Sequence, residues 1–235
     1  MDQRPEDEAG ATTMINTIDI RVGEIDSHVD QGLQWIRSGL IVVAPLENGY
    51  VFLADAFDQD AVRAIHALRG DALGIAAQVL ISGQDVIDGI ARDVSENARL
   101  LMSKFWPGQL SFNLHPQRAL TWDLGDGKRL DQVCVRVPSD FVLSLVRKSG
   151  PLAVSSAAQA GQPPIGNILD IVAREYDIAG IFDAGILEAG QVSSMVSDGA
   201  TGVEVIREGA VSIDAMRAVL PEIIVSGSTN FRLSE

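Results

Sequence analysis

The sequence predicts an α/β domain in which helices pack against a sheet. Segments with strand-like and helix-like patterns alternate along the chain without internal repeats, which is typical of this class. The chain has 235 residues, of which 46% are apolar, enough to build one substantial core. No apolar run approaches the ~20 residues that a membrane-spanning helix needs, so we expect no contact with a membrane.

The first half of the chain begins this alternation. Its expected strands are short apolar or alternating runs, and they lie at Met14–Val22, Leu40–Ala44, Tyr50–Ala54 and Ile75–Ile81. Its expected helices carry apolar residues at helical spacing, and they lie at Asp26–Arg37, Asp60–Leu68 and Ser95–Phe105. Gly39 is expected to close the first helix, and Asp58 to cap the second.

The second half continues the pattern to about residue 220. Its expected strands lie at Leu110–Leu114, Val133–Val137, Leu152–Ser155, Ile178–Phe182, Val192–Val196 and Val203–Ile206. Its expected helices are one capped by Ser139 and running through Leu145, then Ile168–Tyr176, and Ser212–Leu220 opened by Ser212. We therefore expect one domain over residues 14–220, a disordered acidic tail at 1–13 and a C-terminal tail at 221–235.

Charge and cysteine content narrow the functional class. The net charge of −14 disfavours RNA binding, which needs clustered cations against the phosphates, although a local basic groove remains possible. The single cysteine, Cys134, cannot form an internal disulfide, which fits a cytoplasmic protein, and its apolar alternating run predicts an inert core thiol. His28, His66 and His115 have no metal-ligand spacing, so no metal site is predicted.

Four phrases carry a family resemblance. They are KFWPGQLSFNL at Lys104–Leu114, CVRVPSD at Cys134–Asp140, PLAVSSAAQAG at Pro151–Gly161 and REGAVS at Arg207–Ser212. In this order and at these spacings they resemble the YrdC-like domain family, the threonylcarbamoyl-adenylate synthases and their paralogues. The family phrases run FWPGPLTLIL, VAVRVPDH, PLAAPSANPSG and RPGAI. The resemblance covers about residues 17–220.

The resemblance implies a fold and an activity. The family fold is a twisted, open, mixed α/β sheet with flanking helices around a concave groove. The groove binds ATP with Mg²⁺, L-threonine and bicarbonate, and it releases pyrophosphate and threonylcarbamoyl-AMP for a tRNA modification. Arg69, Arg136, Ser156 and Arg207 are expected to converge in that groove.

The family's substrate loop, P-T-D-T-V-Y-G-L, reads PLENGYVF here. Pro45 and Tyr50 match the family, and Glu47 keeps the charge of its aspartate. Leu46 and Asn48 replace the two threonines, and losing a hydroxyl leaves a polar ligand group unpaired at a cost of roughly 1–3 kcal/mol. This loop therefore does not favour threonine as the ligand.

The residues that the family uses for catalysis are mostly replaced. Its K-x-R reads Arg69-Gly70-Asp71, and its S-A-N reads Ser156-Ala157-Ala158. Arg69 and Ser156 are the remaining candidates for catalytic roles, although Arg69 is equally well explained as a solvated residue favoured by a helix C-terminus. Asp71 is expected to repel a triphosphate.

The candidates for binding a nucleotide or another anion lie on later strands. Arg136 alternates with Val135 and Val137, so it faces away from the core; the competing interpretation is an ion pair with Asp140 or with an acid on a neighbouring strand. Ser193 and Ser194 stand in the family's phosphate turn, or in an ordinary surface turn. Arg207 ends a strand at a position where the family also carries arginine.

Two hypotheses remain open from the sequence. The first is a synthase with weak or altered activity, which would use ATP and Mg²⁺. The second is a catalytically silent paralogue whose groove holds a nucleotide, an anion, an amino acid or a partner protein.

Overall fold

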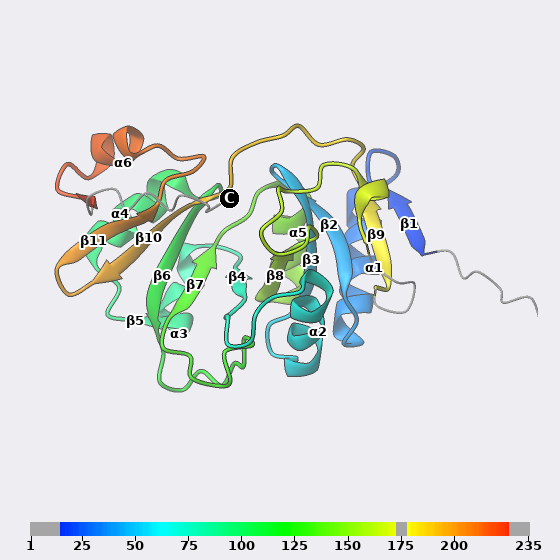
Figure 1. Cartoon of the computed structure of the whole chain (residues 1–235), viewed down its shortest axis with the longest axis horizontal. Coiled ribbons are helices and arrows are strands. Elements are labelled where there is room, and N and C mark those ends of the chain that lie inside the picture. Colours follow the sequence, from blue (N-terminus) through cyan, green and yellow to red (C-terminus); the bar gives the residue numbers. More distant parts are fainter. Residues whose placement is uncertain (1–14, 173–177, 226–235) are drawn as a thin grey trace, which may run out of the picture.

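The computed structural model describes residues 15–172 and 178–225 of the chain. Its strands are β1 (Asn16–Asp19), β2 (Val42–Leu46), β3 (Gly49–Asp55), β4 (Gln78–Leu80), β5 (Ala91–Arg92), β6 (Leu110–Pro116), β7 (Val133–Arg136), β8 (Leu152–Ser156), β9 (Gly180–Asp183), β10 (Ser194–Gly199), β11 (Gly202–Arg207) and β12 (Ile224–Val225). They form one mixed sheet in the order β1-β9-β2-β3-β8-β4-β7-β6-β10-β11-β12, with β5 paired to β6 (Figure 1). The predicted α/β class and the twisted open sheet are confirmed.

The helices are short and flank this sheet. They are α1 (Ile25–Arg37), α2 (Gln59–Arg69), α3 (Ile87–Ile90), α4 (Glu96–Phe105), α5 (Asp140–Ser149) and α6 (Ile213–Val219), with 3₁₀ turns at η1 (Gln84–Val86) and η2 (Ile168–Asp170). Within the described parts of the chain, no helix is long and apolar enough to cross a membrane.

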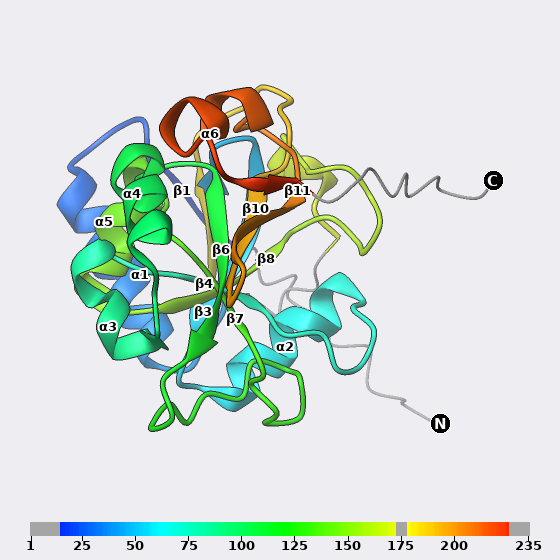
Figure 2. The ribbon, with the colours of Figure 1, turned by 90° about the vertical axis from the view of Figure 1, so that its left-hand side faces the viewer.

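Two apolar cores hold the layers together. Helices α1 and α5 lie side by side (Figure 2) and bury Val29 and Leu145 against Leu53 of β3. Helix α2 packs against β3 and β8, and its Ile65 shares the larger core with Phe52. Because neighbouring residues of a strand point to opposite faces, β3 supplies Leu53 to one core and Phe52 to the other.

Local capping signals were largely predictable. Asp58 accepts hydrogen bonds from the amides of Asp60 and Ala61 at the start of α2, and Ser212 caps α6. Gly39 follows α1 with a left-handed φ of 74°. The prediction for Ser139 was wrong in mechanism: it precedes α5, but its hydroxyl makes no cap bond and donates instead to Glu47, at 3.2 Å.

Two further predictions need correction. The helix expected at Ile168–Tyr176 is only the 3₁₀ turn η2, because Ile171 is already extended (φ −73°, ψ 119°), and residues 173–177 lie outside the described ranges. The predicted end of the domain at 220 is too early, because Ile223 is buried and β12 pairs with β11. The expected N-terminal tail, 1–13, also lies outside the described residues.

Candidate functional site

A groove with a cavity of about 410 Å³ opens on the face of the sheet that carries the polar side chains of β7. Val133 and Val135 point into the core, so Cys134 and Arg136, which alternate with them, point into the groove. The end of α2, the loop after it and the end of β8 complete the wall. The candidate residues that line it are Tyr50, Arg69, Arg136, Ser156, Ser193 and Arg207. The four residues expected to converge therefore line one groove.

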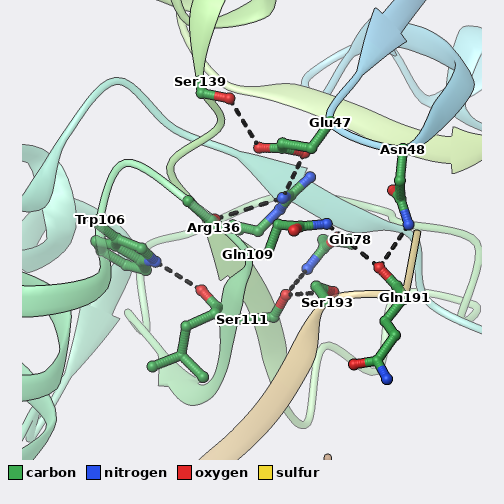
Figure 3. A network of polar contacts seen from close by, with 12 residues as sticks. Glu47, Asn48, Gln78, Trp106, Gln109, Ser111, Arg136, Ser139, Gln191 and Ser193 are labelled. Carbon is green, nitrogen blue, oxygen red and sulfur yellow. Dashed lines mark hydrogen bonds and ion pairs between the residues drawn. The ribbon is translucent and has the colours of Figure 1, made fainter. Parts of the chain in front are cut away.

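Arg136 is buried in the groove wall, with 3% of its surface exposed. Its Nη1 lies 2.9 Å from Oε2 of Glu47 and 3.4 Å from the carbonyl of Gly108. Glu47 also accepts from Ser139 through its other oxygen, so both carboxylate oxygens are engaged (Figure 3). The acid that pairs with Arg136 thus comes from the turn between β2 and β3 rather than from Asp140 or a neighbouring strand. This pair cancels much of the positive charge on one side of the groove.

Arg69 lies at the other side of the groove, in the last turn of α2. Its Nε is 3.5 Å from Oδ1 of Asp71, whose side chain is only 6% exposed. His66 binds the same carboxylate, with Nδ1 2.8 Å from Oδ2, while its Nε2 lies 2.8 Å from the carbonyl of Leu124. Gly70, at a left-handed φ of 73°, turns the chain so that Asp71 folds back against the helix end. Asp71 is therefore an internal partner of Arg69 and His66 rather than the free repelling charge expected from the sequence.

The sequence interpretation missed His66 as part of this cluster. The available signal was its position in the last turn of a helix, one turn before an acid that follows a terminal glycine. A left-handed glycine at a helix end reverses the chain, which can bring a following acid back to the last turn.

Arg207 and Ser193 form the third corner of the groove. Arg207 donates to the carbonyl of Ser193 through Nη2 (2.8 Å) and Nε (3.2 Å). No carboxylate of the described residues lies within ion-pair range of its guanidinium. Arg207 is therefore the groove arginine whose charge is least offset.

The groove floor between these corners is polar but uncharged. The amide nitrogen of Gln78 donates to Ser111 Oγ (2.7 Å) and approaches Cys134 Sγ (3.3 Å), and Ser111 bonds Ser193 (Figure 3). Burial raises the pKa of the Cys134 thiol to about 11, against the opposing effects of Gln78, Arg207 and Arg136. The thiol is protonated at neutral pH, but the predicted core position is wrong, because Cys134 lines the groove and is partly exposed.

Two serines at the end of β8 have different surroundings. Ser156 Oγ accepts from the amide of Ala158 at 3.2 Å and so shapes the local turn. Ser155 is 5% exposed, lines the cavity, and its hydroxyl has no hydrogen-bond partner among the described residues. In the register of β8 against β3, Ser155 lies opposite Phe52 of the core, so its side chain points to the core face and that of Ser156 to the opposite face.

Two other candidates, Tyr50 and Pro45, have structural roles. The Tyr50 hydroxyl lies 2.6 Å from the carbonyl of Gly185 and accepts from Ala184, and burial raises its pKa to about 12. Pro45 pairs with Tyr50 in the β2–β3 ladder and is not part of the cavity lining.

Ser194 is the candidate that the structure contradicts. It lies opposite Leu110 in the register of β10 and β6, so it points to the core face while Ser193 faces the groove. Its hydroxyl is fully buried, donates to the carbonyl of Val211 and accepts from the amides of Gly209 and Val211. No hydrogen-bonding capacity is left for an anion.

The connection between β9 and β10 passes over the groove and forms part of its wall through Val192 and Ser193. Two side-chain amides bind one carbonyl of this connection: Asn48 Nδ2 lies 2.5 Å, and Gln109 Nε2 3.4 Å, from the oxygen of Gln191 (Figure 3). Asn48 stands where the family loop has threonine, and Gln109 where the family phrase has proline.

The carboxylates of the groove do not form a metal centre. Within residues 15–172 and 178–225, no group of three or more His, Cys, Asp or Glu side chains could hold a metal ion.

Known proteins resemble this chain in both sequence and structure. Residues 34–209 match the family Sua5/YciO/YrdC, described as "Telomere recombination". A putative threonylcarbamoyl-AMP synthase of Mycobacterium tuberculosis is 34% identical over 187 residues, 79% of this chain and 85% of that protein. The threonylcarbamoyl-AMP synthase of Pyrococcus abyssi is 27% identical over 214 residues, 90% of this chain and 62% of that protein.

Solved structures also resemble this chain. The structure of P. abyssi Sua5 complexed with L-threonine matches with a TM-score of 0.79 at 25% identity, over 91% of this chain and 63% of that one. This chain thus spans less than two thirds of that archaeal protein. Escherichia coli YciO, at 19% identity, shares the fold with a TM-score of 0.68 over 83% of this chain and 94% of its own. The chain belongs to the Sua5/YciO/YrdC family.

Proposed function

We propose that this chain is a divergent YrdC-like protein that binds a nucleotide or a related anionic small molecule in its groove. On this proposal it forms threonylcarbamoyl-AMP weakly or not at all. The observation that carries the proposal is the internal pairing of two groove arginines, Arg69 with Asp71 and Arg136 with Glu47.

A synthase of this family must hold a triphosphate, which needs several uncompensated cations or backbone amides directed at it. Here the acids of the chain offset two of the three groove arginines before any ligand arrives. Leu46 and Ala158 also lack the hydrogen-bonding groups of the family motifs. Both features favour retained binding over retained catalysis.

Magnesium does not fit the groove as a resident ion. Mg²⁺ prefers oxygen ligands and is commonly held by one or two carboxylates together with substrate phosphates. Glu47 and Asp71 both have their carboxylates engaged by cationic or hydroxyl groups of the chain. Any magnesium would therefore have to enter on a nucleotide, and we derive no step through it.

The second candidate function is a threonylcarbamoyl-AMP synthase whose altered residues still suffice. The relatives that carry that name, one of them 34% identical, favour it. In either case we propose a cytoplasmic protein, since a single cysteine forms no internal disulfide and needs no oxidising compartment.

Pyrophosphate release from ATP, L-threonine and bicarbonate tests the two candidates. We expect a rate at least ~10²-fold below that of a relative with intact motifs measured alongside, since losing one well-placed electrostatic contact commonly costs that much. The triple variant Leu46→Thr, Asp71→Arg, Ala158→Asn should bind ATP more tightly than the unmodified chain. Robust threonine-dependent release by the unmodified chain would establish the second candidate instead.

A further inference from the structure

A chain of hydrogen bonds connects Gln78, Ser111 and Ser193 at the groove (Figure 3). Gln78 Nε2 lies 2.7 Å from Ser111 Oγ, which in turn lies 3.1 Å from Ser193 Oγ. Val79 and Phe112, which follow the first two residues in sequence, belong to the larger core, so Gln78 and Ser111 point to the groove face. Gln78 and Ser193 line the cavity, whereas Ser111 is fully buried.

The burial of Ser111 fixes the direction of this chain. Among the described residues, the only hydrogen-bond partners of its hydroxyl are Gln78 Nε2 and Ser193 Oγ. An amide nitrogen can only donate, so the Ser111 proton has one acceptor within reach, the hydroxyl oxygen of Ser193. Any other arrangement would leave a buried O–H group without a partner, which costs free energy. Ser111 therefore donates to Ser193.

Arg207 donates to the same hydroxyl oxygen. Its Nη2 lies 3.4 Å from Ser193 Oγ, and a guanidinium can only donate. With two donors directed at it, the hydroxyl oxygen of Ser193 has both of its acceptor positions engaged. The Ser193 proton has no acceptor in the part of the chain that the structure describes. It is therefore available to a molecule in the groove.

The backbone of Ser193 is also held in place. Arg207 donates to its carbonyl oxygen through Nη2 (2.8 Å) and Nε (3.2 Å). The chain passes the same carbonyl again at Gly209, where a Cβ atom would lie 3.0 Å from that oxygen and would clash with the carbonyl oxygen of Val192. The position of the Ser193 donor is thus set before a ligand binds, which lowers the entropic cost of binding.

We infer that Gln78 and Ser111 are positioning residues that hold the Ser193 hydroxyl as a hydrogen-bond donor directed into the groove. Because Ser193 and Arg207 both offer donors, this corner favours a group that only accepts, such as a phosphate, over a group that must donate. The inference rests on the proposed binding function and deepens it, since it adds residues that act on a ligand through Ser193.

The matched variants Ser111→Thr and Ser111→Val test the inference. Threonine and valine have nearly the same shape, and only threonine keeps the hydroxyl; the family phrase FWPGPLTLIL also has threonine at this position. AMP and inorganic pyrophosphate are titrated calorimetrically into the full chain in EDTA, so that no metal offsets the phosphates. We expect Ser111→Thr to bind both probes within about twofold of the unmodified chain, and Ser111→Val to bind them about two- to tenfold more weakly.

Equal affinities in the two folded variants would overturn the inference and leave the proposed binding function intact. Binding of neither probe to the unmodified chain would overturn both. The melting temperature of each variant shows whether it has folded. Should Ser111→Val not fold, Gln78→Met takes its place, because it removes the amide at a half-buried position.

A double-mutant cycle separates positioning from a purely structural role. Ser193→Ala removes the donor itself and should weaken binding of both probes about two- to tenfold. If Ser111 acts through Ser193, Ser111→Val should then cause no further loss in the Ser193→Ala background. A loss of the same size in both backgrounds would show that Ser111 acts independently of Ser193, and would refute the inference.

Discussion

The variant Glu47→Gln should bind anions more tightly, because Glu47 occupies the guanidinium that an anion would use. Its Oε2 lies 2.9 Å from Arg136 Nη1, and its side chain is 16% exposed. An anion that accepts from the other edge of the same guanidinium would lie ~5–6 Å from this carboxylate. At effective dielectric constants between 20 and 80, the repulsion is roughly 1–3 kcal/mol per unit charge.

Removing the charge should therefore tighten AMP binding about tenfold, measured by calorimetry at low salt. We also expect Glu47→Gln to lower the free energy of unfolding. Arg136 is almost fully buried, and in the variant it would face a neutral glutamine oxygen instead of a carboxylate. Removing the partner of a buried charge completely costs about 3–5 kcal/mol. Because glutamine keeps one hydrogen-bond acceptor, we expect urea unfolding to show a loss of stability below that range.

The control Glu24→Gln removes one charge at an exposed position at the start of α1, whose side chain makes no cap bond. It should leave AMP affinity unchanged, which separates the local effect from the change in net charge. AMP affinity that is unchanged or weaker in folded Glu47→Gln would refute the reasoning that Glu47 competes with a ligand.

Three further predictions follow from charge and burial. Binding to tRNA at physiological salt should be no tighter than the nonspecific range of ~10⁻⁴–10⁻⁶ M, because the net charge is −14; submicromolar, salt-resistant binding in a filter assay would contradict this. The Cys134 thiol should react slowly with a thiol reagent at pH 8 in the native protein and quickly after unfolding. Its pKa rises from 9.0 to about 11 on folding, so its contribution to stability is complete below pH 9 and is lost as the pH rises through 11. Tyr50→Phe should lower the free energy of unfolding by about 1–3 kcal/mol, because the amide of Ala184 loses its acceptor and the carbonyl of Gly185 its donor; an unchanged urea midpoint would argue against this.

The parts of the fold that depend on nearby residues could be predicted. The Asp58 cap and the left-handed Gly39 involve partners within four residues, and the strand alternation that turns Arg136 toward the groove is equally local. Ser139 has the sequence of an ordinary cap, yet its partner Glu47 lies 92 positions away. Such a choice between a local and a distant acceptor is decided only by the folded chain.

The candidate site shows the same division. Alternation could not separate Ser193 from Ser194, because that required the register of β10 against β6. The sequence exposed the charge reversal at Asp71, but only the fold shows that this carboxylate is buried between His66 and Arg69. The prediction of a helix from Ile168 was wrong because apolar spacing alone does not show where the backbone leaves the helical conformation.

The turn between β2 and β3 consists of two residues with different partners. Glu47 holds Arg136 in the groove wall, and its neighbour Asn48 holds the carbonyl of Gln191 in the connection that passes over the groove. A ligand that displaces Glu47 from Arg136 by shifting this turn also strains the bond to Gln191. The two contacts are then thermodynamically linked, and linkage is reciprocal. A partner protein that binds the overlying connection and weakens its bond to Asn48 would make anion binding at Arg136 more favourable. An anion at Arg136 would weaken that bond by the same coupling free energy.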